Sequence, residues 1–220
     1  MTSSQASNRT NTVSQLIDAR ADAVPKSTAL IDRGRIWTYA ELAAESRRLA
    51  GGLLKLGIGS GDRVGFWLPN IAQYLTLHIA CARIGAITIS INTRFRSSEV
   101  GDIVGRSGCR ALVLWPSFKD IAFLDILAEV DSAQLEQLEI LITYSEDDQV
   151  TQLPGRQLSR RTVSYTDLAR SKMFAGDAAN AQSGVVVFTT SGTTAAPKLV
   201  LHSQASISHH AHDVASFFDW

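Results

Sequence analysis

Apolar residues follow two different spacings along this chain, and the two spacings alternate. Short continuous apolar runs predict buried β-strands, whereas apolar residues that recur every three or four positions predict amphipathic helices. The predicted elements are, in chain order, strand 63–68, helix 71–85, strand 86–91, helix 97–108, strand 110–115, helix 118–130, strand 138–144 and, further on, strand 185–190. This alternation predicts an α/β fold, in which helices cover a mainly parallel sheet.

The segments before the first of these strands are predicted to be a tail, a helix and a hairpin. Residues 1–12 are polar and are expected to form a frayed tail, and a helix that starts at residue 13 is expected to end near Pro25. The apolar runs "ALI" and "IW" flank the turn "DRGR", a pattern that predicts a short β-hairpin.

The next helix carries both a start signal and a stop signal. Thr38 and Glu41 have the spacing of a capping box, in which each side chain accepts a hydrogen bond from a backbone N–H at the helix start. Leucines at positions 42, 49, 53 and 56 recur at helical intervals, and Gly57 follows them. Glycine is the residue that most easily adopts the left-handed conformation that ends many helices, so we expect the helix to end there.

Residues 145–162 interrupt the alternation. They are polar, contain Pro154 and Gly155 and show no apolar period, so we predict a surface excursion there. A short helix at 165–171 is expected to lead back towards the strand at 185–190. No repeat of fixed period is present, so residues 13–220 are predicted to belong to one unit.

Composition narrows the class of protein. The 220 residues are 45% hydrophobic and 19% charged, with 21 basic and 21 acidic residues, so the net charge gives no reason to expect a nucleic acid as partner. No apolar run reaches the roughly 18 residues that span a bilayer, and the first residues lack the apolar core of a secretory signal. We therefore expect a cytoplasmic protein. Cys81 and Cys109 lack CxxC spacing and are expected to be buried or incidental thiols.

The chemistry of the chain is concentrated in the segment 189–198, here called the phosphate loop. It follows the strand at 185–190 and combines small hydroxyl side chains, a glycine that lets the backbone turn, and a lysine. Polyphosphates need closely approaching donors and at least one cation. We therefore predict a nucleotide site made of Thr190, Ser191, Gly192, Thr193, Thr194 and Lys198.

This loop differs from the P-loop pattern GxxxxGK[ST]. In "GTTAAPKL" a proline takes the place of the second glycine and a leucine takes the place of the hydroxyl that holds magnesium. Pro197 biases Ala196 towards extended geometry, so Lys198 is expected to begin a strand and the loop to connect the two strands of a hairpin.

The string "TSGTTAAPK" resembles the phosphate-binding signature of the AMP-forming adenylate synthetases, the superfamily of acyl-CoA synthetases, luciferases and peptide-synthetase adenylation domains. "WTYAEL", "LAGGLLKLGIGSGDRVGFWLPN" and "ACARIGAITISINTRFRSSEV" are similar to its upstream landmarks, and the last string is closer to acyl-CoA synthetases. Ala195 departs from the usual glycine, at a cost on the order of 1 kcal/mol if φ is positive there. Leu199 replaces a second common glycine.

The resemblance implies a two-step reaction. A carboxylic acid attacks MgATP to give an acyl-adenylate and pyrophosphate, and the thiol of CoA then displaces AMP. ATP, Mg²⁺, CoA and a small-molecule acid are the expected ligands. The chain is expected to be the N-terminal part of the large adenylate-forming domain, without the C-terminal domain and without catalytic residues of its own. We expect it to be inactive alone, and homodimer formation is left open.

Three alternatives complete these predictions. The enzyme could pass the acyl group to a carrier-protein thiol or resemble luciferase, or the chain could be a non-catalytic interaction or folding module.

A metal site is predicted to be absent from the final helix, although His209, His212 and Asp213 share one face. These three are expected to face solvent because the opposite face carries the stripe expected to face the core, made of Ile207, His210, Val214 and Phe217.

Overall fold

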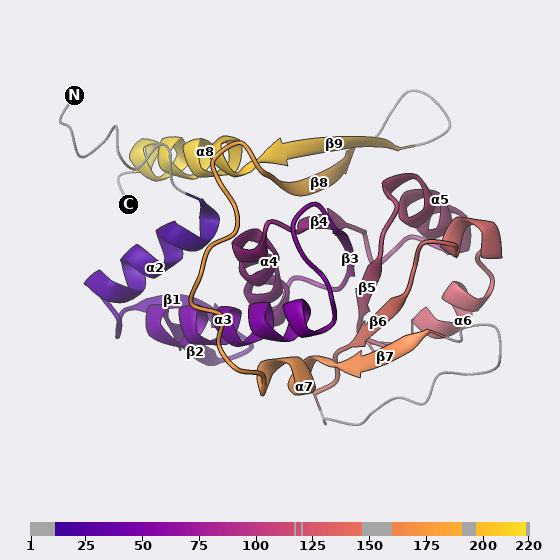
Figure 1. The fold of residues 1–220 in the computed structure, drawn as a ribbon, viewed down its shortest axis with the longest axis horizontal. Helices are drawn as coiled ribbons and strands as arrows, with labels where there is room; N and C mark the ends of the chain where they lie inside the picture. Colours follow the sequence, from indigo (N-terminus) through magenta and orange to yellow (C-terminus); the bar gives the residue numbers. More distant parts are fainter. Residues whose placement is uncertain (1–11, 117, 120, 147–159, 191–196, 219–220) are drawn as a thin grey trace.

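The computed structural model describes residues 12–116, 118–119, 121–146, 160–190 and 197–218. Within these ranges the strands form one sheet in the order β7-β6-β5-β3-β4-β8-β9, apart from a separate hairpin of β1 (Thr28–Asp32) and β2 (Arg35–Thr38). Six strands of the sheet run parallel and the last is antiparallel to β8 (Figure 1). They are β3 (Arg63–Trp67), β4 (Ile87–Ser90), β5 (Ala111–Leu114), β6 (Ile140–Thr143), β7 (Arg161–Ser164), β8 (Gly184–Thr190) and β9 (Lys198–Ser203). The predicted α/β fold is confirmed.

Helices cover both faces of the sheet. One apolar cluster joins the sheet to α3 (Tyr39–Lys55), α4 (Ala72–Ile84) and α7 (Tyr165–Ala169). A second cluster, on the opposite face, joins it to α5 (Ser97–Ser107), α6 (Phe123–Ala128) and the 3₁₀ turn η1 (Ser132–Leu135). The helix α2 (Val13–Ala23) packs on α3 and α4, and α8 (Gln204–Phe217) continues from β9 and contacts α2.

Local signals placed both ends of α3 correctly. The side chain of Thr38 accepts from the backbone N–H of Glu41 and Glu41 accepts from Thr38, so the predicted capping box is present at the start of α3. Gly57 has a φ of 86°, in the left-handed region that the sequence predicted just after this helix. The helix expected at 118–130 is shorter, because Lys119 has a φ of 52°, which is incompatible with a right-handed helix, and α6 begins only at Phe123.

Two predictions need correction where distant parts of the chain meet. Arg161 and Thr162, assigned to the excursion 145–162, belong to β7, which pairs in parallel with β6. Thr12, assigned to the tail, is buried, and its hydroxyl donates to Asp177 at 2.7 Å. Residues 1–11 and 147–159 lie outside the described residues.

The core-facing side of α8 was predicted correctly only in part, since Ile207 packs against a buried apolar cluster. His210 and Phe217 are exposed, Ile207 and Val214 are partly buried, and the fully buried positions are Gln204 and Ser208. The side chain of Gln204 donates to the carbonyl of Ala82 and accepts from the backbone N–H of Val13. The helix is therefore oriented by hydrogen bonds to a polar side chain, which an apolar stripe does not reveal.

The helices that follow neighbouring strands lie on opposite faces of the sheet at one place. After β3 the chain crosses one face of the sheet through α4, whereas after β4 and β5, the two neighbours of β3, it crosses the other face through α5 and α6. The connections diverge around the carboxyl end of β3, and ligands of open parallel sheets commonly bind at such a point.

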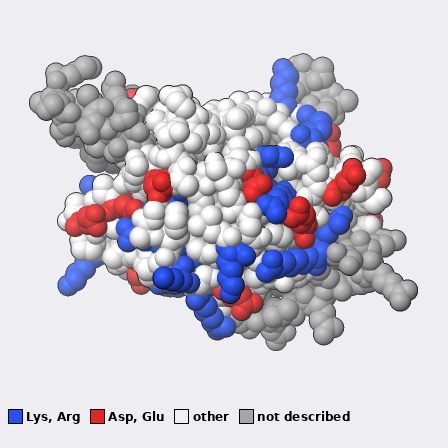
Figure 2. All heavy atoms as spheres, in the orientation of Figure 1, with Lys and Arg blue, Asp and Glu red and all other residues white. Residues whose placement is uncertain are grey.

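Acidic and basic side chains occur next to one another on the face drawn in Figure 2, in keeping with the balanced composition. Among the described helices, none combines the length and apolar content required to cross a bilayer.

Candidate functional site

The hairpin of β8 and β9 carries the described part of the predicted nucleotide site. Thr190 pairs with Lys198 and Phe188 with Val200 in an antiparallel register, so both the predicted strand that begins at Lys198 and the predicted hairpin are confirmed. Thr190 and Lys198 face each other across the two strands where these meet the loop, and both side chains are exposed. The other four predicted site residues, Ser191, Gly192, Thr193 and Thr194, lie outside the described residues.

Leu199, which departs from the family signature, has a packing role. Its side chain lies against the apolar cluster between the sheet and α5 and α6, on the side of β9 opposite to that of Val200. A glycine at this position could not make that contact.

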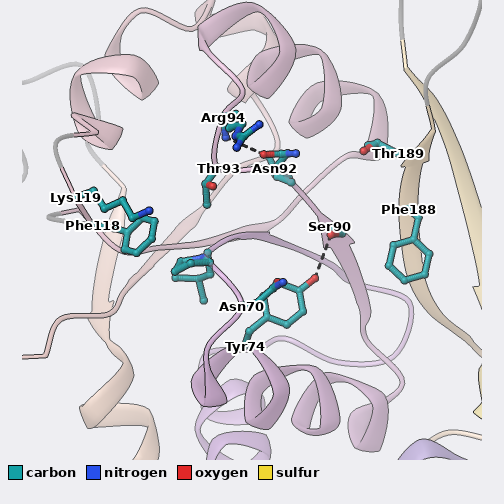
Figure 3. A pocket seen from close by; sticks show the side chains of 13 residues that line it. Asn70, Tyr74, Ser90, Asn92, Thr93, Arg94, Phe118, Lys119, Phe188 and Thr189 are labelled. Atoms are coloured by element: carbon teal, nitrogen blue, oxygen red, sulfur yellow. Dashed lines mark hydrogen bonds between the residues drawn. The ribbon is translucent and has the colours of Figure 1, made fainter. Parts of the chain in front are cut away.

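A pocket of about 450 Å³ lies beside this hairpin, at the carboxyl ends of the parallel strands (Figure 3). Its lining comes from four places that are far apart in the sequence: the residues after β3, the end of β4 and the loop that follows, the loop after β5, and β8. The lining residues used below are Asn70, Tyr74, Ser90, Asn92, Arg94, Lys119, Phe188 and Thr189. Phe188 and Thr189 line the pocket and Thr190 follows them in β8, so this strand connects the pocket to the start of the phosphate loop.

Hydrogen bonds hold the loop after β4 in shape. The indole N–H of Trp67, a fully buried residue, donates to the carbonyl of Asn92 at 3.1 Å. The side chain of Asn92 in turn accepts from the backbone N–H of Arg94 at 2.9 Å, as in a turn that an asparagine side chain stabilises. The backbone that carries Arg94 is thus tied to the core.

The floor of the pocket is held by a bond between α4 and β4. The hydroxyl of Tyr74 donates to Ser90 at 3.2 Å, as the dashed line in Figure 3 marks. Burial raises the pKa of Tyr74, so its phenol stays neutral at physiological pH.

The charges of the pocket favour an anionic ligand. Arg94 and Lys119 are the charged residues among its described lining, and no carboxylate accompanies them. Positive side chains in a concave surface raise the local concentration of anions, and hydroxyl and amide groups beside them supply adjustable hydrogen bonds. The site therefore suits phosphate or carboxylate groups.

Sequence reasoning named the two ends of the hairpin but missed the residues of the pocket. Arg94 and Lys119 stand shortly after predicted parallel strands, and the carboxyl ends of such strands meet at one edge of the sheet. That rule would have drawn attention to 92–94 and 116–119. The sequence alone did not say which strands are neighbours.

The cysteines and the histidines of the final helix lie outside the pocket. Cys81 and Cys109 are buried free thiols, and burial raises their pKa to about 12 and about 11, so neither is a reactive thiolate. His209 and Asp213 are exposed and His212 is partly buried. In the described ranges no group of His, Cys, Asp and Glu side chains has an arrangement able to hold a metal ion.

Comparison with known proteins identifies relatives of almost the whole chain. The sequence pattern of the family described as "AMP-binding enzyme" matches residues 17–219. The medium-chain acyl-CoA ligase ACSF2, mitochondrial, of Bos taurus is 32% identical over 218 residues, which are 90% of this chain and 34% of that protein. The acyl-CoA ligase sidI of Aspergillus fumigatus is 32% identical over 193 residues, 80% of this chain and 30% of that protein. This chain thus spans about a third of the length of these curated relatives.

Solved structures share the fold. The anthranilate CoA ligase AuaEII, crystallised with anthranoyl-AMP, superposes with a TM-score of 0.75 at 21% identity, over 89% of this chain and 35% of that one. VinN with 3-methylaspartate superposes with a TM-score of 0.74 at 20% identity, over 96% of this chain and 52% of that one. At this identity the likeness concerns the architecture of the sheet and its helices.

Proposed function

The chain belongs to the AMP-binding enzyme family, and we propose that it forms the phosphate-binding part of an AMP-forming acid-CoA ligase. The observation that supports the proposal is the hairpin, in which Thr190 pairs with Lys198 and whose strand β8 lines a cationic pocket at the carboxyl ends of the parallel strands. The ligase names of two relatives that are each 32% identical support the choice of reaction within the family.

The proposed role of these residues is electrostatic. A carboxylate and the α-phosphate of ATP repel each other, and pyrophosphate leaves with several negative charges. The ammonium group of Lys198 and the hydroxyls of Thr190, Ser191, Thr193 and Thr194 would offset this repulsion and hold the leaving group. Arg94 and Lys119 extend the positive surface away from the loop.

The ligands of the proposed reaction are ATP, Mg²⁺, CoA and a carboxylic acid. The donor set of the hairpin fits phosphate, since hydroxyl and ammonium groups are common phosphate partners. Magnesium would lower the charge of the triphosphate. The described residues contain no metal-binding cluster, so we assign no protein ligand to it.

We propose turnover for a protein that contains these residues together with counterparts of the segments that the longer relatives have in addition. We expect the 220 residues by themselves to be inactive. Pyrophosphate release with a panel of carboxylic acids should be measured on the 220-residue chain and on the product of the complete open reading frame. Acid-dependent release by the second alone is the expected result. Release by neither would contradict the ligase proposal.

The residues of the loop are tested in the active protein. Lys198→Ala and Thr193→Ala should each lower kcat/KM for ATP, the lysine variant by about 100-fold, because a donor that acts on developing charge is lost. Lys55→Ala removes an exposed lysine at the end of α3 and should leave the rate unchanged. Normal ATP affinity and normal rate in both loop variants would falsify the assignment.

Three alternatives are distinguished by adding assays of CoA thioester formation and of oxygen consumption to that of pyrophosphate release. An enzyme that serves a carrier protein would release pyrophosphate with an acid but form no CoA thioester, and a luciferase-like enzyme would consume oxygen. A non-catalytic module would give no acid-dependent release under any condition. The CoA reaction is favoured because both curated relatives are named as acyl-CoA ligases.

A further inference from the structure

One side chain outside the pocket is bonded directly to the backbone next to Lys198. Arg106, in the last turn of α5, donates through Nη2 to the carbonyl oxygen of Pro197 at 2.6 Å, although the two residues are 91 positions apart. The same guanidinium grips Asp102, one helical turn earlier, through Nε at 2.8 Å and Nη2 at 2.6 Å. Two of its nitrogens are thereby used in fixed directions.

Lys198 is consequently held from three sides. The carbonyl before it is bonded to Arg106, the side chain after it, Leu199, is packed against the apolar cluster beside α5, and its own backbone pairs with Thr190 across the hairpin. The lysine side chain itself is exposed. The backbone that carries the ammonium group is therefore anchored, while the group remains available to a ligand.

We propose that Arg106 is a positioning residue for the phosphate site, which fixes the start of β9 and with it the direction in which Lys198 approaches phosphate. The proposal rests on the proposed function. Asp102 contributes to this positioning, because its carboxylate holds the guanidinium of Arg106 in the orientation that reaches Pro197. Preorganised donors act on charge without first being ordered, so loosening this anchor weakens nucleotide binding.

Two other roles for Arg106 make different predictions. As a cation that contacts phosphate directly, it would act more strongly once the neutralising carboxylate of Asp102 was removed. As a partner of the negative end of the α5 dipole only, it would affect stability and leave nucleotide affinity unchanged. The ATP affinity of Asp102→Asn distinguishes a direct phosphate contact from positioning. The ATP affinity of Arg106→Ala distinguishes a role in helix stability alone from positioning.

The experiment uses the product of the complete open reading frame and its Arg106→Ala, Arg106→Lys and Asp102→Asn variants. Arg110→Ala is the matched control. Like Arg106, Arg110 donates to carboxylate side chains and to a backbone carbonyl, and these partners, Asp62, Glu139 and Gly57, lie outside the hairpin. MgATP affinity is measured by calorimetry, and amide hydrogen exchange is followed over residues 198–203.

The expected result is a MgATP dissociation constant about tenfold higher for Arg106→Ala, equal to about 1.4 kcal/mol. Arg106→Lys should restore part of the affinity, Asp102→Asn should weaken binding, and Arg110→Ala should match the unaltered protein. Exchange over β9 should be faster in Arg106→Ala and Asp102→Asn alone.

Three results would overturn the inference. Tighter binding by Asp102→Asn would make Arg106 a direct phosphate cation. Unchanged affinity of Arg106→Ala, with or without faster exchange, would leave it a purely structural residue. If the unaltered protein bound no MgATP, the proposed function would fail together with the inference, whereas a normal affinity in the unaltered protein confines any failure to Arg106.

Discussion

The guanidinium of Arg83 is buried, with 1% of its side chain exposed, and donates to both carboxylate oxygens of Asp18 at 2.9 and 2.7 Å. Asp18 also pairs with Arg47 at 3.0 Å, so a single carboxylate links α2 to α3 and α4. A buried arginine is tolerated only when it is paired, because removing its partner leaves an uncompensated charge. These residues fix the packing of three helices and lie apart from the pocket.

His78 supplies a prediction at the same scale. Its Nδ1 lies 3.0 Å from the hydroxyl of Thr88, and burial lowers its pKa to about 4. At pH values between the pKa of a free histidine and this lowered pKa, the unfolded chain binds a proton that the folded chain does not bind. The free energy of unfolding should therefore decrease as the pH falls through this window, by roughly 2–3 kcal/mol from this residue.

The contribution of His78 is isolated by a variant that cannot titrate. Urea unfolding of the unaltered chain and of His78→Gln should be compared at pH 7 and pH 4.5, because carboxylates also titrate in this range and their effect cancels in the difference. The variant should lose less stability than the unaltered chain on acidification. Equal losses would mean that His78 has an ordinary pKa in the folded protein.

At the scale of elements, the β1–β2 hairpin stabilises the start of another element. The first turn of α4 has no cap of its own, since Ile71 at the N-cap position makes no side-chain hydrogen bond. Asp32, at the end of β1, accepts from the backbone N–H of Ala72 at 3.0 Å and so caps the helix from outside. Asn70, just before that turn, and Tyr74, within it, line the pocket.

Loss of this external cap should be measurable. Asp32→Ala should lower the free energy of unfolding by about 1–2 kcal/mol, the usual cost of removing a cap, and Asp32→Asn should cost less because an amide oxygen can still accept. Denaturant unfolding measures both. Asp22→Ala, at an exposed position of α2, should change stability by no more than about 0.5 kcal/mol. An Asp32→Ala variant as stable as this control would show that the bond contributes nothing.

At the scale of the whole molecule, three positively charged residues of the pocket and hairpin lie at the same edge of the sheet. Arg94 follows β4 and Lys119 follows β5, and β3 lies between these two strands. Lys198 begins β9, on the other side of β8. The cations thus converge because parallel strands carry their following loops to the same end.

Ligand binding at this edge should stabilise the entire fold. If MgATP binds the folded state alone, a concentration of about 100 times its dissociation constant should add about 2.7 kcal/mol to the free energy of unfolding. Thermal unfolding of the product of the complete open reading frame, with and without MgATP, measures this effect. Lys198→Ala should shift less at the same concentration. A shift of equal size in this variant would place the nucleotide away from the hairpin.

The features that the sequence determined by itself are those governed by neighbours along the chain. The capping box of Thr38 and Glu41 and the left-handed Gly57 involve residues only a few positions apart, and both were predicted from the sequence. The start of β9 at Lys198 was likewise predicted from the proline directly before it. The alternation of apolar patterns was sufficient for the α/β class, because it reflects which faces of helices and strands are buried.

Only the tertiary structure decided which of these elements are neighbours. The position of β3 between β5 and β4, the addition of β7 to the sheet, the burial of Thr12 and the bond from Arg106 to Pro197 all join residues that are distant in sequence. Such contacts depend on the packing of whole elements, and no local pattern encodes them. The pocket belongs to this group, since its lining is assembled from loops that meet only when the parallel strands are in order.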